Sequence, residues 1–176
     1  IPVFGMSYED GEAIANQEES ILFFDLQSEI TDIPSQNVFF QPPSVDEPYI
    51  MLGGHADSVT AGGGINDNGS GISAILSIAK ENQNKDLPIR YAFWGGEELG
   101  LLGSYHFIST SEFEDLDKIS SYINLDMIAS PNFARMIYDG DGSMGTPSGP
   151  QHSDEIEEFF EEHFEAQGLE HQPTPF

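Results

Sequence analysis

The stretch YIMLGGHADSVTAGGGINDNGSGISAILSIAKEN, residues 49–82, carries the pattern that decides the fold class. Its first part, YIMLGGH, is a short apolar run bounded by a glycine-rich segment, which predicts a buried strand. Its last part, SGISAILSIAKEN, places apolar side chains at the spacing of one helix face, at Ile72, Ile75, Leu76 and Ala79. A strand that leads through a loop into a helix is the building unit of α/β folds.

The loop between this strand and this helix, GGHADSVTAGGGINDNGSG, combines many glycines with one histidine and two aspartates. Glycine tolerates backbone conformations that other residues avoid, so such a loop can place polar side chains in unusual positions. The ionisable residues are His55, Asp57 and Asp67. Ionisable groups on so permissive a backbone indicate a binding or catalytic loop.

Strand and helix signals alternate on both sides of this unit. We expect further strands over residues 1–7, 20–30, 36–41, 89–96, 119–130 and 134–140, and further helices over residues 8–17, 98–111 and 153–168. Three prolines within residues 41–48 predict a turn there. The alternation favours an α/β fold, with a mostly parallel sheet covered by helices.

The composition limits the classes of protein. Hydrophobic residues make up 38% of the 176 residues, which is typical of a globular chain. There is no apolar run near the 18 residues of a membrane span. The chain has no cysteine, so disulfides and thiolate metal sites are excluded and a metal would bind through histidine and carboxylates.

The charge balance is strongly acidic, with 31 acidic residues, 5 basic residues and a formal net charge of −26. Nucleic acids and anionic membranes are bound through basic patches, so neither is expected as a partner. Two interpretations of the charge remain open: a coat that keeps the protein soluble, and adaptation to high salt, where screening relaxes self-repulsion.

Polar side chains gather where the predicted strands end. One imidazole and five carboxylates lie at those ends or in the loops that follow, namely His55, Asp57, Asp67, Glu97, Glu98 and Asp126. In sheets of this kind, sites form beyond the carboxyl ends of the strands. So many carboxylates repel one another unless a divalent cation neutralises them. Histidine with carboxylates and without sulfur suits a catalytic zinc site.

Four motifs in a fixed order resemble the co-catalytic di-zinc exopeptidases of metallopeptidase clan MH: HADS, NDNGSG, GEELGLLGS and NLDMI. The chain is most similar to the zinc aminopeptidase branch, including secreted leucyl-type enzymes, from about residue 36 onward. The resemblance implies a three-layer α/β/α sandwich with a mostly parallel mixed sheet, two zinc ions in the complete enzyme, peptide substrates and an extracellular or secreted location. Residues 1–30 resemble the tail of a protease-associated insertion, and residues 31–176 the catalytic domain.

The resemblance also implies roles for the residues around the first zinc ion. His55 would bind this ion together with Asp126, and Asp57 would hold the imidazole from behind. That arrangement fits the usual hydrogen bond from a ligating histidine to a carboxylate. Asp67 would bridge both ions, and its peptide bond to Asn68 would be cis.

Around the second zinc ion, Glu98 would be a ligand and Glu97 the general base that takes a proton from zinc-bound water. In the resembled family a distal histidine completes this second site, beyond the segment in which this sequence stops at Phe176. The implication is a catalytic domain without its C-terminal end, in which the His55 site fills first and full activity is not expected. His171 matches the loop before that ligand rather than the ligand itself.

Three alternatives are weighed against the aminopeptidase interpretation. The first is a non-catalytic relative, which would be marked by loss of ligands. The second is a carboxypeptidase or N-acetyl-peptide deacetylase of the same clan, which would need a cation for the substrate carboxylate, from Arg90 or Arg135. The third, a calcium loop at NDNGSG, fails because position twelve from Asn66 is Ser77 and not glutamate. His106, His152 and His163 are expected to be structural or solvated.

Overall fold

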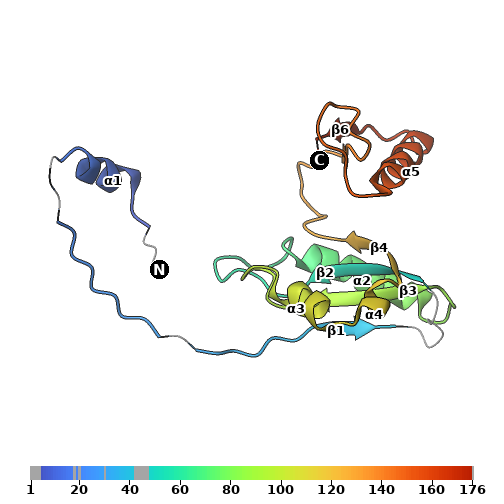
Figure 1. The fold of residues 1–176 in the computed structure, drawn as a ribbon, viewed down its shortest axis with the longest axis horizontal. Helices are drawn as coiled ribbons and strands as arrows, with labels where there is room; N and C mark the ends of the chain where they lie inside the picture. The colour runs from blue at the N-terminus through green and yellow to red at the C-terminus, as the bar shows by residue number, and fades with distance from the viewer. Residues whose placement is uncertain (1–4, 18, 20, 30, 42–47, 176) are drawn as a thin grey trace. The chain divides into compact units, whose positions relative to one another are not determined.

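The computed structural model describes residues 5–17, 19, 21–29, 31–41 and 48–175 (Figure 1). The chain divides into two compact units, residues 1–34 and residues 35–176. Among the described residues, no helix is both long enough and apolar enough to cross a membrane.

The N-terminal unit contains one helix, α1 (Tyr8–Ala15), as expected. Its first turn is capped by Ser7, whose hydroxyl oxygen accepts a hydrogen bond from the backbone N–H of Asp10 at 3.1 Å. The strand expected over residues 20–30 is wrong for the described residues 21–29, which form no regular structure. Ile21 is 100% and Phe23 92% exposed, so the apolar run has not found the packed surface that strand-forming residues need.

The strand expected over residues 1–7 is also not observed where it can be judged. Residues 5–7 are irregular, and residues 1–4 lie outside the described residues. The turn expected over residues 41–48 lies mostly outside them as well.

The larger unit is built on a four-stranded sheet. Its strands are β1 (Val38–Phe40), β2 (Tyr49–His55), β3 (Ile89–Trp94) and β4 (Ile119–Asn124), in the spatial order β1-β3-β2-β4. Strand β2 is parallel to both β3 and β4, whereas β1 is antiparallel to β3. The mostly parallel mixed sheet expected from the sequence is therefore confirmed.

Helices cover both faces of this sheet. Helix α2 (Gly69–Asn82) places Ile75 and Ala79 against Leu52 and Tyr91. On the opposite face, the core consists of Tyr49, Met51, Ala92 and Trp94, and Phe107 of α3 (Leu102–Thr110) packs against it. Side chains alternate between the faces of a strand, so β2 serves both cores and the unit has three layers, α/β/α (Figure 1).

Several boundaries differ from the sequence-based expectation. The helix expected from residue 98 begins only at Leu102, because Gly100 and Leu101 adopt positive φ values of 106° and 59° and form a turn. A short helix, α4 (Phe113–Leu116), was not expected. The strand expected over residues 119–130 ends at Asn124, where β4 loses its pairing with β2.

The C-terminal part of this unit contains β5 (Met136–Tyr138), α5 (Ser153–Ala166) and β6 (Gln172–Thr174). Strands β5 and β6 pair in parallel as a two-stranded sheet, and α5 contacts β5. The helix was expected, and it is followed by Gly168 with φ 65°. Strand β6 was not expected, because its sequence contains Pro173 and is only three residues long.

Candidate metal centre

His55 is the centre of a cluster of polar side chains at one end of the sheet. It is the last residue of β2, where it pairs with Trp94 of β3, and it is only 3% exposed. Its Nε2 atom lies 2.9 Å from a carboxylate oxygen of Asp67 and 3.5 Å from one of Asp126. A carboxylate oxygen of Glu97 lies 4.0 Å from the same nitrogen. The carboxyl ends of the parallel strands thus bring together residues that are up to 71 positions apart in sequence.

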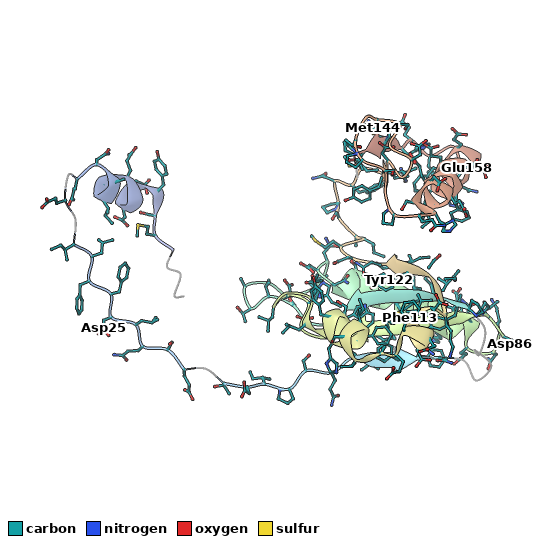
Figure 2. The ribbon with its side chains drawn as sticks, in the orientation of Figure 1. Asp25, Asp86, Phe113, Tyr122, Met144 and Glu158 are labelled. Atoms are coloured by element: carbon teal, nitrogen blue, oxygen red, sulfur yellow. The ribbon has the colours of Figure 1, made fainter. Side chains whose placement is uncertain are left out.

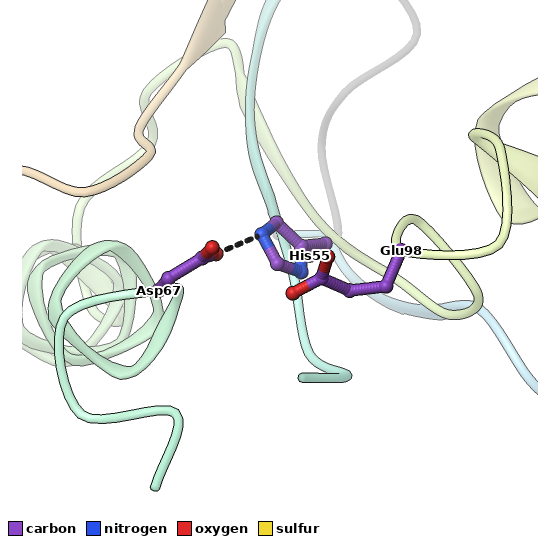
Figure 3. A group of neighbouring side chains, drawn as sticks. All are labelled: His55, Asp67 and Glu98. Atoms are coloured by element: carbon purple, nitrogen blue, oxygen red, sulfur yellow. Dashed lines mark ion pairs between the residues drawn. The ribbon is translucent and has the colours of Figure 1, made fainter. Parts of the chain in front are cut away.

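Asp67 and Glu98 complete a compact group with His55, shown in Figure 3. Each of the three offers a possible ligand atom, and these atoms lie within 4.8 Å of one another. The sequence-based assignment gave Glu98 to a second ion, apart from His55; the structure brings Glu98 into one group with both His55 and Asp67. The peptide bond between Asp67 and Asn68 is cis, as the resemblance implied.

Asp57 holds the turn that carries the two glutamates. Its carboxylate accepts hydrogen bonds from the backbone N–H groups of Glu97 at 3.0 Å and Glu98 at 3.1 Å. The closest partner of the His55 Nδ1 atom is the main-chain carbonyl oxygen of Asp57 at 3.0 Å, whereas the carboxylate is 3.6 Å away. Asp57 therefore contacts the imidazole mainly through its backbone, and its side chain orients Glu97 and Glu98.

The charges of the cluster alter the protonation of two of its members. Burial lowers the pKa of His55, but the negative charges of Asp126, Glu97, Asp67 and Asp57 outweigh burial, and the pKa is raised overall. For Asp57, burial raises the pKa of the carboxyl group, but hydrogen bonds from the Glu97 and Glu98 backbone outweigh it, and the pKa is lowered. The cluster is thus a strongly negative site that favours a cation.

The donor set fits zinc. Imidazole nitrogen and carboxylate oxygen are both zinc ligands, and a catalytic zinc ion takes three protein ligands. The Nδ1 atom of His55 faces a backbone carbonyl, which leaves Nε2 directed at the carboxylates, and a ligating histidine commonly has such a partner for its other nitrogen. The residues present can therefore hold zinc.

A cavity of about 260 Å³ adjoins the cluster. It is lined by His55, Glu97 and Asp126 together with Trp94, Leu101 and Tyr122. The Trp94 indole donates a hydrogen bond to the Tyr122 hydroxyl at 2.8 Å, and this hydroxyl donates to the side-chain oxygen of Asn124 at 2.8 Å. Tyr122 comes from β4 (Figure 2).

Trp94, Tyr122 and Asn124 were not predicted from the sequence as residues of the site. Trp94 and Asn124 end the strands that lead to Glu97 and Asp126, so strand position was the signal that could have found them.

Other candidate residues lie in different surroundings. His171 contacts the carbonyl oxygen of Leu169 at 3.3 Å and the Phe164 ring at 5.7 Å between centroids. The Nδ1 atom of His152 lies 2.8 Å from a carboxylate oxygen of Glu155 on the surface. Neither histidine contributes to the His55 cluster.

A second group of acidic side chains, Asp139, Asp141 and Glu157, also brings carboxylate oxygens within 4.8 Å of one another. This group was not predicted from the sequence. Asp139 follows β5 and Glu157 lies on α5, so the packing of this helix against this strand creates the group.

Comparison with known proteins identifies relatives that match the chain over nearly its whole length, including the site. Leucine aminopeptidase 2 of Trichophyton equinum is 44% identical over 182 residues, covering 100% of this chain and 37% of that protein. The probable leucine aminopeptidase 2 of Aspergillus oryzae is 43% identical, covering 99% of this chain and 36% of that protein. The chain thus spans little more than a third of the length of these relatives.

Solved structures agree with the fold. A zinc aminopeptidase from Bacillus subtilis matches with a TM-score of 0.60 and 27% identity, over 78% of this chain and 33% of that one. An aminopeptidase from Aneurinibacillus sp. strain AM-1 matches with a TM-score of 0.52 and 26% identity, over 61% of this chain and 27% of that one. The sequence profile of peptidase family M28 matches residues 37–176. The chain therefore belongs to peptidase family M28.

Proposed function

We propose that the protein is a zinc-dependent aminopeptidase that hydrolyses the amino-terminal residue from peptides. The observation that carries the proposal is the convergence of a buried imidazole and four carboxylates at one end of the sheet, on His55, Asp67, Glu97, Glu98 and Asp126. The family membership and the aminopeptidase names of the relatives support the same activity.

The metal-binding residues divide between two zinc ions in this proposal. His55, Asp67 and Asp126 would hold one ion, while Glu98 and Asp67 would contribute to the other. When bound, zinc polarises the scissile carbonyl and lowers the pKa of its bound water toward about 7. Asp67 lies close to both Glu98 and His55, which supports its role as the shared ligand.

Glu97 is the proposed general base. Its carboxylate lies 4.0 Å from His55 Nε2, whereas the Asp67 carboxylate lies 2.9 Å from the same atom. Glu97 is therefore near the proposed ligands but farther from the imidazole than Asp67 is. It takes a proton from the attacking water and delivers it to the leaving amine. Asp57 supports this step by fixing the Glu97 backbone through its hydrogen bond.

Acidic side chains of the site suit a substrate with a free amino terminus. A peptide ammonium group carries a positive charge and is attracted to a cavity lined by Glu97 and Asp126. An exopeptidase that recognises a carboxylate needs a cation instead. Arg90 on β3 pairs with Met51 on β2. Met51 precedes His55 by four residues, which corresponds to about 13 Å along the strand. It donates to the Tyr49 hydroxyl at 2.8 Å, so it does not serve the site.

The remaining family-based expectations are part of the same proposal. Peptides are the substrates, and the location is extracellular or secreted. The net charge of −26 supports the absence of nucleic acid and anionic membranes among the partners. Residues 1–30 belong to a protease-associated insertion, which agrees with the separation of residues 1–34 as a unit of their own.

The test compares two substrates with one leaving group. Leucine p-nitroanilide should be hydrolysed by zinc-loaded protein, and the activity should disappear on chelation and return with zinc. N-acetyl-leucine p-nitroanilide, which has no ammonium group, should be a poor substrate. Equal rates on both substrates, or activity that resists chelation, would overturn the proposal.

A further inference from the structure

The loop of Asp67 and the loop of Asp126 are joined by a side chain that the proposed metal chemistry does not use. Asn68 follows Asp67 directly and is only 2% exposed. Its Nδ2 atom donates a hydrogen bond to the Leu125 carbonyl at 2.9 Å, and its Oδ1 atom accepts one from the Met127 N–H at 3.4 Å. These two backbone groups stand immediately before and after Asp126. Asn68 is thus hydrogen-bonded to the Asp126 loop on both sides of Asp126.

Two neighbouring side chains extend the same contact. The Oδ1 atom of Asn66 accepts a hydrogen bond from the Ala129 N–H at 3.0 Å, and its Nδ2 atom donates to the Ser130 hydroxyl at 3.1 Å. The Ser70 hydroxyl accepts from the Ile128 N–H at 3.1 Å and donates to the Asn66 carbonyl at 2.6 Å. Alternate side chains of the NDNGS segment therefore bind a continuous stretch of the other loop.

The Leu125 carbonyl is held in a space that two glycines keep open. A Cβ atom at Gly71 would collide with this carbonyl oxygen, and one at Gly54 would lie 2.8 Å from it and 3.1 Å from Asn68 Nδ2. The N–H of Leu125 donates to the Gly53 carbonyl at 2.9 Å. Both backbone polar groups of Leu125, the residue before Asp126, are therefore fixed: its N–H by strand β2 and its carbonyl by Asn68.

Asn68 also caps helix α2, because its Oδ1 atom accepts a hydrogen bond from the Gly71 N–H at 3.1 Å. Serine and aspartate cap helices about as well as asparagine does. A cap needs only the side-chain oxygen, whereas the bond to Leu125 uses the amide nitrogen. The two roles can therefore be separated by substitution.

We propose that Asn68 is a positioning residue that sets the separation of the Asp67 and Asp126 carboxylates and thereby the affinity of the site for metal. Asp67 is tied to Asn68 by the chain, and Asp126 is tied to it by hydrogen bonds, so one buried side chain relates both ligands. The inference rests on the proposed function, because it assumes that these two carboxylates bind zinc.

The first experiment measures zinc affinity by competition with a chelator, and separately the melting temperature of the metal-free protein. Asn68→Ser keeps a capping oxygen but is too short to reach Leu125, whereas Asn68→Ala removes both functions. Both variants should bind zinc about 10–100-fold more weakly than wild type, the usual cost of losing a group that orients a ligand. The metal-free serine variant should melt closer to wild type than the alanine variant does.

The matched control is Asn82→Ala. Asn82 ends the same helix at its far end and donates its Nδ2 to the Ile78 carbonyl at 2.9 Å. This variant should lower the melting temperature at most and leave zinc affinity unchanged. Asn66→Ala, at a half-buried position, removes hydrogen bonds to the Asp126 loop that lie farther from Asp126. It should weaken zinc binding by a smaller factor than Asn68→Ser.

A double-mutant cycle asks whether Asn68 acts through Asp126. In an Asp126→Asn background, Asn68→Ser should weaken zinc binding by less than about twofold, because residues that act through one another are not additive. Wild-type affinity in Asn68→Ser would overturn the inference, as would an undiminished loss in the Asp126→Asn background. Absence of zinc binding in the wild-type protein would instead overturn the proposed function.

Discussion

The described residues include two groups of acidic side chains with similar dimensions and different chemistry. The His55 group places Asp67 and Asp126 around an imidazole nitrogen, 2.9 Å and 3.5 Å away. The group of Asp139, Asp141 and Glu157 has no imidazole among its three members, and its buried carboxylate faces backbone N–H groups. A count of acidic residues would not distinguish the two groups, whereas their hydrogen-bond partners do.

Asp139 shows how completely a carboxylate can be used in a turn. It is 0% exposed and accepts hydrogen bonds from the backbone N–H groups of Gly142, Ser143 and Met144 at 2.9–3.0 Å, and from the Thr146 hydroxyl at 3.2 Å. Glu157 likewise accepts from the Gly140 N–H at 2.8 Å. These donors stabilise the charged carboxylates within the fold, so this group organises the turn after β5, whereas the carboxylates of the His55 group are the proposed metal ligands.

Removal of the imidazole should have the largest effect on metal binding. We expect His55→Ala to reduce zinc to background after dialysis, because the substitution removes the only nitrogen ligand of the proposed site and leaves carboxylates that repel one another. Elemental analysis measures the bound zinc, with Asp139→Asn as the control that keeps it. Equal zinc in wild type and His55→Ala would remove the distinction between the two groups.

Glu97 should affect rate and not metal content. Glu97→Gln retains the size and shape of the side chain but cannot accept the proton of the attacking water. We expect kcat of the full-length enzyme on leucine p-nitroanilide to fall by roughly 100-fold or more. The control is Glu114→Gln, at an exposed position of α4. A rate within a factor of two of wild type, with zinc retained, would assign the general base elsewhere.

The Asp139 group should affect stability alone. In Asp139→Asn one side-chain oxygen becomes an N–H donor that faces the donors now bound by the carboxylate, so the turn after β5 should be destabilised. The melting temperature should fall clearly, while zinc affinity stays at the wild-type value. Glu157→Gln should cost less, because Glu157 accepts from the Gly140 and Asp141 N–H groups through a single oxygen, which the amide can keep, whereas Asp139 uses both of its oxygens. A loss of zinc in Asp139→Asn would mean that the two groups are not chemically distinct.

Salt should produce the smallest effect and separate the metal-free from the metal-loaded protein. A net charge of −26 opposes folding, and salt reduces the range of this repulsion from about 10 Å at 0.1 M to about 3 Å at 1 M. We expect the melting temperature to rise from low to molar KCl, and to rise more without zinc, because bound zinc already compensates the His55 group. A flat or falling melting temperature would leave only the solubility interpretation of the charge.

Local patterns were sufficient to locate the central unit and most of the site. Strand β2 and helix α2 lie within one residue of their expected bounds, because a short apolar run and a helical repeat are both local signals. The convergence of His55, Asp67 and Asp126 also followed from the sequence, since parallel strands direct their carboxyl ends to one edge of the sheet. The resemblance of four motifs to a zinc exopeptidase family added the expected role of each ligand.

Other features could not be obtained from local patterns. Residues 21–29 have strand-forming composition but form no strand, because the pairing of a strand depends on a neighbour and not on its own residues. The two functions of Asp57, a carbonyl toward His55 and a carboxylate toward the Glu97 and Glu98 backbone, depend on how two loops meet.

The sequence by itself determined the α/β class, the acidic character and the set of candidate ligands, because residue type and local periodicity carry that information. Only the tertiary structure decided which carboxylates gather around the His55 imidazole and which are bound by the backbone N–H groups of a turn. It also decided that Asn68 joins the loops of Asp67 and Asp126. The physical reason is that a hydrogen bond requires two groups within about 3 Å, and such proximity between distant segments is created by the packing of the sheet and its helices.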